Sequence, residues 1–112
     1  METLKKNYEF RRLYNKGKSA VTKNLAVYCR KCRAPGRVGF TVSTKIGNAV
    51  VRNRIRRKFK EIYRLNSDRL DPHYEMVIVA RTRAAEADYH ALERDFLKAC
   101  DKLGILQKED KE

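Results

Sequence analysis

The sequence predicts an α+β fold in which helices pack against a small sheet as a compact α/β sandwich. Three observations support this prediction. Residues 8–16, 48–65 and 88–103 carry apolar side chains at helical spacing, and residues 24–33, 38–43 and 74–80 show the patterns of β-strands. The resulting order is helix, strands, helix, strand, helix. A chain of 112 residues can bury one modest core but not two, so residues 1–112 are expected to form a single domain.

The first predicted element is a short helix over residues 8–16. Asn7 is a suitable N-cap and Gly17 a suitable end. Phe10, Leu13 and Tyr14 follow the i, i+3, i+4 spacing of one helix face. These three side chains are therefore expected to lie on the same side of the helix.

Two strands are predicted next, over residues 24–33 and 38–43. Apolar side chains alternate with others in both segments: Leu25, Val27 and Cys29 in the first, and Val38, Phe40 and Val42 in the second. Ala34, Pro35 and Gly36 between them are typical of a turn. The two segments are therefore expected to pair as an antiparallel hairpin.

A long helix is predicted over residues 48–65, after the break at residues 45–48. At about 100° per residue, one narrow stripe of this helix is apolar, and it consists of Val51, Ile55, Phe59 and Ile62. The neighbouring face is cationic, and it consists of Arg52, Asn53, Arg56, Arg57, Lys60 and Arg64. One face is expected to pack while the adjoining face stays charged.

The last third of the chain predicts a loop, a strand and a helix. After the loop at residues 66–72, Tyr74–Ala80 is apolar throughout except for Glu75, as in a strand covered on both faces. A helix from Asp88 to Leu103 follows, with Asp88 as its N-cap and Gly104 at its end. Residues 107–112 are expected to be a charged, frayed tail.

The charge of the chain predicts a polyanionic partner. The net charge is +13, and residues 1–64 contribute +16 of it from 19 basic and 3 acidic side chains, whereas residues 65–112 sum to −3. Such an asymmetry indicates nucleic acid or an anionic membrane, bound through the N-terminal part of the chain. No apolar run reaches the roughly 20 residues of a membrane span, and residues 1–14 lack the apolar core of a signal peptide. We expect a soluble, cytoplasmic protein with no membrane contact.

Cysteine and histidine give little sign of a metal or redox site. Cys29, Cys32 and Cys100 are odd in number and lack the spacing of a disulfide framework, which fits reduced thiols. Strand alternation is expected to put Cys29 and Cys32 on opposite faces. His73 and His90 have no nucleophile or carboxylate partner at motif spacing. We expect neither protein catalytic residues nor a protein-held metal.

The basic helix is the strongest candidate binding surface. Eight basic residues and one acid, Glu61, lie between Lys45 and Arg64, and Arg52, Arg56 and Lys60 form a like-charge ladder at i, i+4 spacing. Such a ladder costs a few tenths of a kcal/mol per pair, which contact with phosphates would relieve. Arginine predominates, and its planar fork suits phosphate oxygens. A solvated charged face is the alternative interpretation.

Residues 45–57 resemble the signature helix of the protein subunits of bacterial ribonuclease P. The run Lys-Ile-Gly-Asn-Ala-Val-Val-Arg-Asn-Arg-Ile-Arg-Arg contains the RNR motif of that family and its KxGxAVxRN lead-in. Residues 10–17, 37–43 and 77–81 are also similar to the family, so the resemblance covers about residues 4–103. It implies the fold of the second domain of ribosomal protein S5, with the signature helix in a left-handed strand–helix–strand crossover, although most such crossovers are right-handed.

The resemblance also implies two RNA-binding surfaces. The first meets the catalytic RNA subunit, and its expected residues are Lys45, Asn48, Arg52, Asn53, Arg54, Arg56, Arg57, Lys60 and Arg64. The second is a cleft between the first helix and the sheet that receives the single-stranded 5′ leader of precursor tRNA. Its expected residues are Phe10, Arg11, Tyr14, Lys16, Tyr28 and Arg30.

Aromatic side chains beside basic ones suit this second role, because bases stack on them with little sequence preference. Periodicity alone favours another interpretation, in which Phe10 and Tyr14 attach the helix to the core. The resemblance favours base stacking for Tyr14 and Tyr28 and leaves Phe10 open.

The activity implied by the resemblance is removal of the 5′ leader from precursor tRNA by hydrolysis of one phosphodiester bond. In this family the RNA subunit holds the catalytic Mg²⁺ ions, so the protein would be a monomeric partner, 1:1 with the RNA, that supplies no acid or base. Two alternatives stay open. A ribosomal or chaperone-like RNA-binding protein would need no aromatic cleft, and a protein-only nuclease would need a carboxylate cluster, whereas most acids here are scattered over the last 48 residues.

Overall fold

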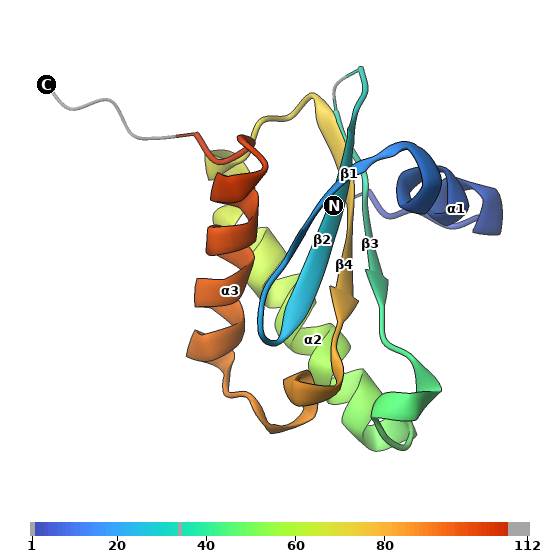
Figure 1. The fold of residues 1–112 in the computed structure, drawn as a ribbon, viewed down its shortest axis with the longest axis vertical. Helices are drawn as coiled ribbons and strands as arrows, with labels where there is room; N and C mark the ends of the chain where they lie inside the picture. The colour runs from blue at the N-terminus through green and yellow to red at the C-terminus, as the bar shows by residue number, and fades with distance from the viewer. Residues whose placement is uncertain (1, 34, 108–112) are drawn as a thin grey trace, which may run out of the picture.

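The computed structural model describes residues 2–33 and 35–107, which form a sheet with helices on both faces (Figure 1). The helices are α1 (Asn7–Lys16), α2 (Ala49–Asn66) and α3 (Tyr89–Lys102), and the strands are β1 (Lys18–Val21), β2 (Leu25–Lys31), β3 (Val38–Thr41) and β4 (Tyr74–Ala80). Short 3-10 turns are η1 (Thr44–Ile46), η2 (Ser67–Arg69) and η3 (Thr82–Glu86). The predicted α+β fold is confirmed.

The sheet corrects the predicted strand pairing. Its order is β1-β2-β4-β3, with β4 antiparallel to β2 and parallel to β3. The predicted hairpin between residues 24–33 and 38–43 is therefore wrong, because the most apolar strand, β4, lies between β2 and β3. β2 instead forms a hairpin with β1, which the sequence analysis missed because only Ala20 of β1 is buried. Ala34 of the predicted turn lies outside the described residues.

Two hydrophobic clusters cover the two faces of the sheet. The larger one lies under α2 and α3, where Leu25 and Ile78 of the sheet meet Phe59 and Phe96 of the helices. Figure 1 shows these two helices on one side and α1 alone on the other. The smaller cluster lies under α1, and it consists of Leu4, Leu13 and Val77 with Phe10, Tyr28 and Val79 packed around them.

The helix ends follow the predicted caps with one exception. Asn48 and Asp88 cap α2 and α3, since their side-chain oxygens accept hydrogen bonds from the third residue after each, at 3.0 and 2.8 Å. The predicted Asn7 cap is wrong, because α1 begins at Asn7 itself. There the Glu9 carboxylate accepts the backbone N–H groups of Lys5 and Lys6, each at 3.0 Å, and so satisfies two donors just before the first turn.

The basic helix α2 connects two neighbouring strands of the sheet. β3 and β4 are parallel neighbours, so β3, α2 and β4 form a strand–helix–strand crossover. The left-handed sense of this crossover stays a prediction.

The predicted loop at residues 66–72 contains η2, and the predicted final helix ends at Lys102, just before Leu103. Of the expected tail, only Gln107 is described, and residues 108–112 lie outside the described residues. Within the described ranges, no helix has the length and hydropathy of a membrane span.

Candidate nucleic-acid interface

The buried stripe of α2 determines which side of the helix faces outward. Ile55, Phe59 and Ile62 are each at most 2% exposed and lie in the larger core, as predicted, and Val51 is half-buried beside them. The charged side chains on the remaining arc therefore stay at the surface. Asn53, Arg54, Arg57, Lys60 and Arg64 are exposed, and Arg52 and Arg56 are partly covered.

Neutral groups hold two of the α2 guanidinium groups. Arg52 Nε donates to the carbonyl of Gly47 at 3.2 Å, and Arg56 Nη1 donates to Asn53 Oδ1 at 3.1 Å. Within the described residues, Arg64 is the only basic side chain of α2 that forms an ion pair; it is bidentate to Glu61 at 3.1 and 2.7 Å. Arg52 and Arg56 are thus positioned by neutral acceptors, which leave their positive charges uncompensated.

A shallow hollow of about 470 Å³ gathers part of the predicted site. It is lined by Asn53, Arg56, Arg57 and Lys60 together with Val50, which is 62% exposed. Val50 was not among the predicted residues, although its place outside the apolar stripe indicated an exposed position. Lys45 and Asn48 are exposed just before the helix, and Arg54 and Arg64 do not line this hollow.

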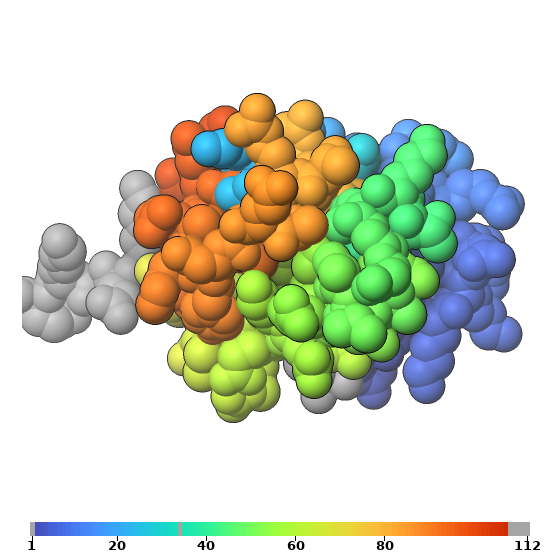
Figure 2. All heavy atoms as spheres, turned by 90° about the horizontal axis from the view of Figure 1, so that it is seen from below, coloured from blue at the N-terminus to red at the C-terminus, as the bar shows by residue number. Residues whose placement is uncertain are grey.

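Figure 2 shows the end of the molecule at which α2 begins. The green β3–α2 connection, the start of α2 in yellow-green and the orange segment around η3 lie on this face. Lys58 Nζ, which was not among the predicted residues, donates to the carbonyl of Ala87 at 3.4 Å and so joins α2 to the segment after η3.

A second polar and aromatic surface lies between α1 and the sheet. The rings of Tyr14 and Tyr28 meet edge to face, with centroids 5.0 Å apart and planes at 81°. The Tyr14 hydroxyl lies 2.8 Å from Thr41 Oγ1 on β3. Tyr14 remains 38% exposed and Tyr28 is half-buried, so both keep surface that a base can reach. The structure thus brings the two predicted tyrosines together.

Phe10 has a packing role in the same place. Its ring packs on the smaller core and lies over Gly39, where an added Cβ would be 2.5 Å from Phe10 Cε1. Arg11 and Lys16 are exposed on α1. The surface around the two tyrosines therefore has exposed cations on α1 and a phenyl ring that attaches α1 to the sheet.

Near the start of α1, two carboxylates pair with Arg30 and Arg37. Arg37, which the sequence analysis missed, lies 2.6 Å from Glu9 and 3.8 Å from Glu75, and Glu75 also pairs with Arg30 at 3.3 Å. The N–H groups of Lys5 and Lys6, with Arg37, lower the pKa of Glu9 to about 2. Glu75 could have indicated this pairing from the sequence, because a carboxylate inside an apolar strand needs a cationic partner.

The three cysteines are free thiols in the structure. Cys29 and Cys100 are buried and Cys32 is half-buried, and burial raises the pKa of all three, that of Cys100 to about 12. In the described part of the chain, no three His, Cys, Asp or Glu side chains are close enough together to hold a metal ion. His73 and His90 are both exposed.

Comparison with known proteins finds one family. The family model described as Ribonuclease P matches residues 1–104. The chain is 43% identical over 107 residues to the Ribonuclease P protein component of Natranaerobius thermophilus, which covers 95% of this chain and 93% of that protein. It is 39% identical over 104 residues to the corresponding protein of Alkaliphilus metalliredigens, which covers 92% and 94%.

Solved structures agree with the sequence relatives. The fold superposes on the RNase P protein of Staphylococcus aureus with a TM-score of 0.87 at 26% identity, over 96% of this chain and 99% of that one. For the RNase P protein of Thermotoga maritima the TM-score is 0.79 at 26% identity, over 88% and 94%.

Proposed function

Because the chain belongs to the family of ribonuclease P protein components, we propose that it binds the catalytic RNA subunit of ribonuclease P through α2. We propose further that it binds the 5′ leader of precursor tRNA through the surface between α1 and the sheet. The holoenzyme would hydrolyse one phosphodiester bond and leave a 5′-phosphate on the tRNA. The expected assembly is one protein monomer with one RNA subunit in the cytoplasm.

The observation that carries the first contact is the uncompensated charge of α2. Arg52 and Arg56 are held by neutral acceptors, and Asn53 fixes the second of them. Guanidinium groups held in this way can meet phosphate oxygens with little further loss of side-chain entropy. Their charge screens the repulsion between the RNA subunit and its tRNA substrate, both of which are polyanions.

The second contact is supported by the Tyr14–Tyr28 pair. A single-stranded leader exposes its bases, and a base that stacks on an aromatic ring contributes about 1–3 kcal/mol with little sequence preference. Arg11 and Lys16 are exposed on α1 and can attract the leader phosphates. This arrangement favours the leader over mature tRNA, because mature tRNA lacks the strand that would occupy the surface.

The magnesium ions of the reaction are proposed to be held by the RNA subunit. A protein-held Mg²⁺ needs converging carboxylates, whereas Glu9, Glu61 and Glu75 each face an arginine. The described residues also contain no group of three potential ligands. The described side chains therefore offer no carboxylate cluster of this kind, and the role that we propose for the protein is binding and positioning.

One assay separates this function from its alternatives. Cleavage of precursor tRNA is measured with the protein alone, with a bacterial ribonuclease P RNA alone at low magnesium, and with both. We expect cleavage at low magnesium only in the mixture. Cleavage by the protein alone would instead indicate a protein nuclease. No gain from mixing would favour a general RNA-binding protein and exclude the proposed role.

A further inference from the structure

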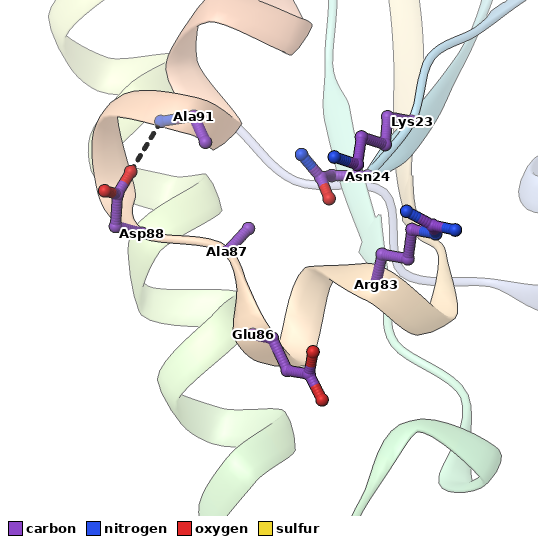
Figure 3. A pocket seen from close by; sticks show the side chains of 7 residues that line it. All are labelled: Lys23, Asn24, Arg83, Glu86, Ala87, Asp88 and Ala91. Carbon is purple, nitrogen blue, oxygen red and sulfur yellow. Dashed lines mark hydrogen bonds between the residues drawn. The ribbon is translucent and has the colours of Figure 1, made fainter.

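A hollow of about 680 Å³ lies outside both surfaces described so far, where the β1–β2 turn meets η3 and the start of α3 (Figure 3). Lys23 and Asn24 come from the turn and Arg83 from η3, whereas Ala87 and Ala91 supply small apolar patches. In Figure 3 the Lys23 and Asn24 side chains extend into the hollow next to each other. Neither proposed RNA contact uses any of these residues.

The part of this surface around Lys23, Arg81 and Arg83 is cationic. An adjoining depression of about 350 Å³ is lined by Lys23, Arg81, Thr82 and Arg83 and by no acidic residue. Arg81 Nη1 donates to the carbonyl of Thr22 at 2.6 Å, which fixes this guanidinium group at the rim. Lys23 and Arg83 are exposed and form no ion pair within the described residues. Three positive charges thus share a small concave surface.

Asn24 presents an unused amide beside these charges. The residue is only 7% exposed, and its backbone is held on both sides: its N–H donates to Asp95 Oδ2 at 2.9 Å, and its carbonyl accepts from Arg81 N at 3.0 Å. Its side-chain amide has no hydrogen-bond partner among the described residues, and Figure 3 shows it directed into the hollow. An amide that lines a hollow with its donors and acceptor free can hydrogen-bond a ligand in place of water.

The two acids that line the hollow leave its cationic side free. Asp88 Oδ1 accepts the N–H of Ala91 at 2.8 Å as the cap of α3. The Glu86 carboxylate points away from Lys23 and Asn24 in Figure 3. An anion is therefore expected at Lys23, Arg81 and Arg83, with an uncharged polar group beside Asn24.

We propose that this hollow is a third RNA-binding surface, at which Lys23, Arg81 and Arg83 bind backbone phosphates and Asn24 hydrogen-bonds the attached nucleotide. The inference rests on the proposed function. The position of the hollow favours the RNA subunit as the RNA that binds there. η3 packs against α2 and η1, and Lys58 joins α2 to Ala87. Figure 2 shows the β1–β2 turn in light blue and η3 in orange on the same end of the molecule as the start of α2. One RNA strand can therefore follow this face.

The test uses the Lys23→Ala/Arg83→Ala variant, since both side chains are exposed and form no ion pair within the described residues. Affinity for ribonuclease P RNA is measured against salt, and affinity of the holoenzyme for precursor tRNA is measured in parallel. Lys98→Ala/Lys102→Ala is the matched control, because it removes two exposed charges from α3. Arg52→Ala/Arg56→Ala on α2 tests the proposed function in the same assay.

We expect the slope of log affinity against log salt to fall by about 2 for Lys23→Ala/Arg83→Ala and to stay unchanged for the control. A loss confined to RNA-subunit binding identifies that RNA as the source, and a loss confined to substrate binding identifies the precursor tRNA. A slope equal to that of the control overturns the third surface while α2 still responds. If the α2 variant also leaves the slope unchanged, the proposed function fails as well.

A second variant tests the amide without changing charge. Asn24→Ala is expected to weaken binding of the same RNA about fivefold, the equivalent of one hydrogen bond, while the salt slope stays the same. Circular dichroism and urea unfolding show whether the variant is folded. Affinity equal to that of the original protein in a folded Asn24→Ala variant contradicts the role of the amide.

Discussion

The hydroxyl groups of Tyr14 and Thr41 lie 2.8 Å apart, and this contact joins the last turn of α1 to β3. β3 is an edge strand of the sheet, and Tyr28, whose ring meets that of Tyr14, lies on β2. Tyr14 is thus held at its hydroxyl by β3 and at its ring by Tyr28 of β2. An aromatic ring held in this way is ready to stack with a base without first losing rotamer freedom.

The first prediction concerns these two rings. Tyr14→Ala and Tyr28→Ala are each expected to weaken holoenzyme binding of leader-bearing tRNA by about 1–3 kcal/mol per lost stacked base, and to leave binding of mature tRNA unchanged. Tyr14→Phe serves as the control, because it keeps the ring and removes only the hydrogen bond to Thr41. Equal losses for both tRNA ligands would place the leader elsewhere.

The second prediction concerns the close approach of α1 to β3. A Cβ at Gly39 would lie 2.5 Å from Phe10 Cε1 and 3.2 Å from Leu4 Cδ1, so Gly39→Ala must displace the ring that attaches α1. We expect the free energy of unfolding to fall by about 1–3 kcal/mol, as for other overpacked cores. Urea denaturation measures the change.

A double variant shows whether Phe10 is the group displaced by Gly39→Ala. Phe10→Leu shortens the obstructing side chain, so it should cost less stability in the Gly39→Ala background than in the original protein. Strictly additive losses would indicate that the clash is relieved elsewhere.

The helices were predictable from the sequence because their signals are local. The stripe of Ile55, Phe59 and Ile62 and the caps at Asn48 and Asp88 all lie within a few positions of one another along the chain. The cationic face of α2 followed from the same periodicity, since the buried stripe leaves the charged side chains on the outward side of the helix.

The strand pairing was not predictable in the same way. Whether β3 pairs with β2 or β4 depends on which strand gains most free energy from burial at the centre of the sheet. That gain is a property of the whole sheet. β1 is an edge strand with one buried residue, so its pattern carried almost no signal. Arg37 was missed for a similar reason, because its partners Glu9 and Glu75 are distant in sequence. The hollow at Asn24 likewise depends on a turn and a helix start that meet only in the folded chain.

The third prediction compares compensated and uncompensated charges on α2. Arg52→Ala/Arg56→Ala is expected to lower the salt slope of RNA-subunit binding by about 1 per lost phosphate contact. Arg64→Ala is expected to lower it by less than 1, because the Glu61 carboxylate already pairs with Arg64 at 2.7 Å. Filter binding over a range of salt concentrations measures both. A larger change for Arg64→Ala than for the double variant would mean that RNA displaces Glu61 and contacts the end of α2 first.

The fourth prediction concerns pH and the start of α1. The N–H groups of Lys5 and Lys6 and the Arg37 guanidinium hold the pKa of Glu9 at about 2, below its ordinary value of 4.5. A carboxylate whose pKa is lower in the folded state stabilises the fold fully above the unfolded value, and this contribution is lost as the pH falls toward the folded value. The Glu9 contribution should therefore be constant above about pH 5 and should decline between 4.5 and 2.

Glu9→Gln isolates this contribution, because the amide oxygen can still accept the backbone N–H groups but carries no charge for Arg37. The difference in free energy of unfolding between the original protein and Glu9→Gln, measured in urea at each pH, should shrink as the pH falls from 4.5 to 2. Glu86→Gln is the control, since Glu86 is exposed and forms no ion pair within the described residues. A difference for Glu9→Gln that stays constant down to pH 2 would mean that folding does not lower the pKa of Glu9, so that neither the N–H groups of Lys5 and Lys6 nor Arg37 favours its charged form.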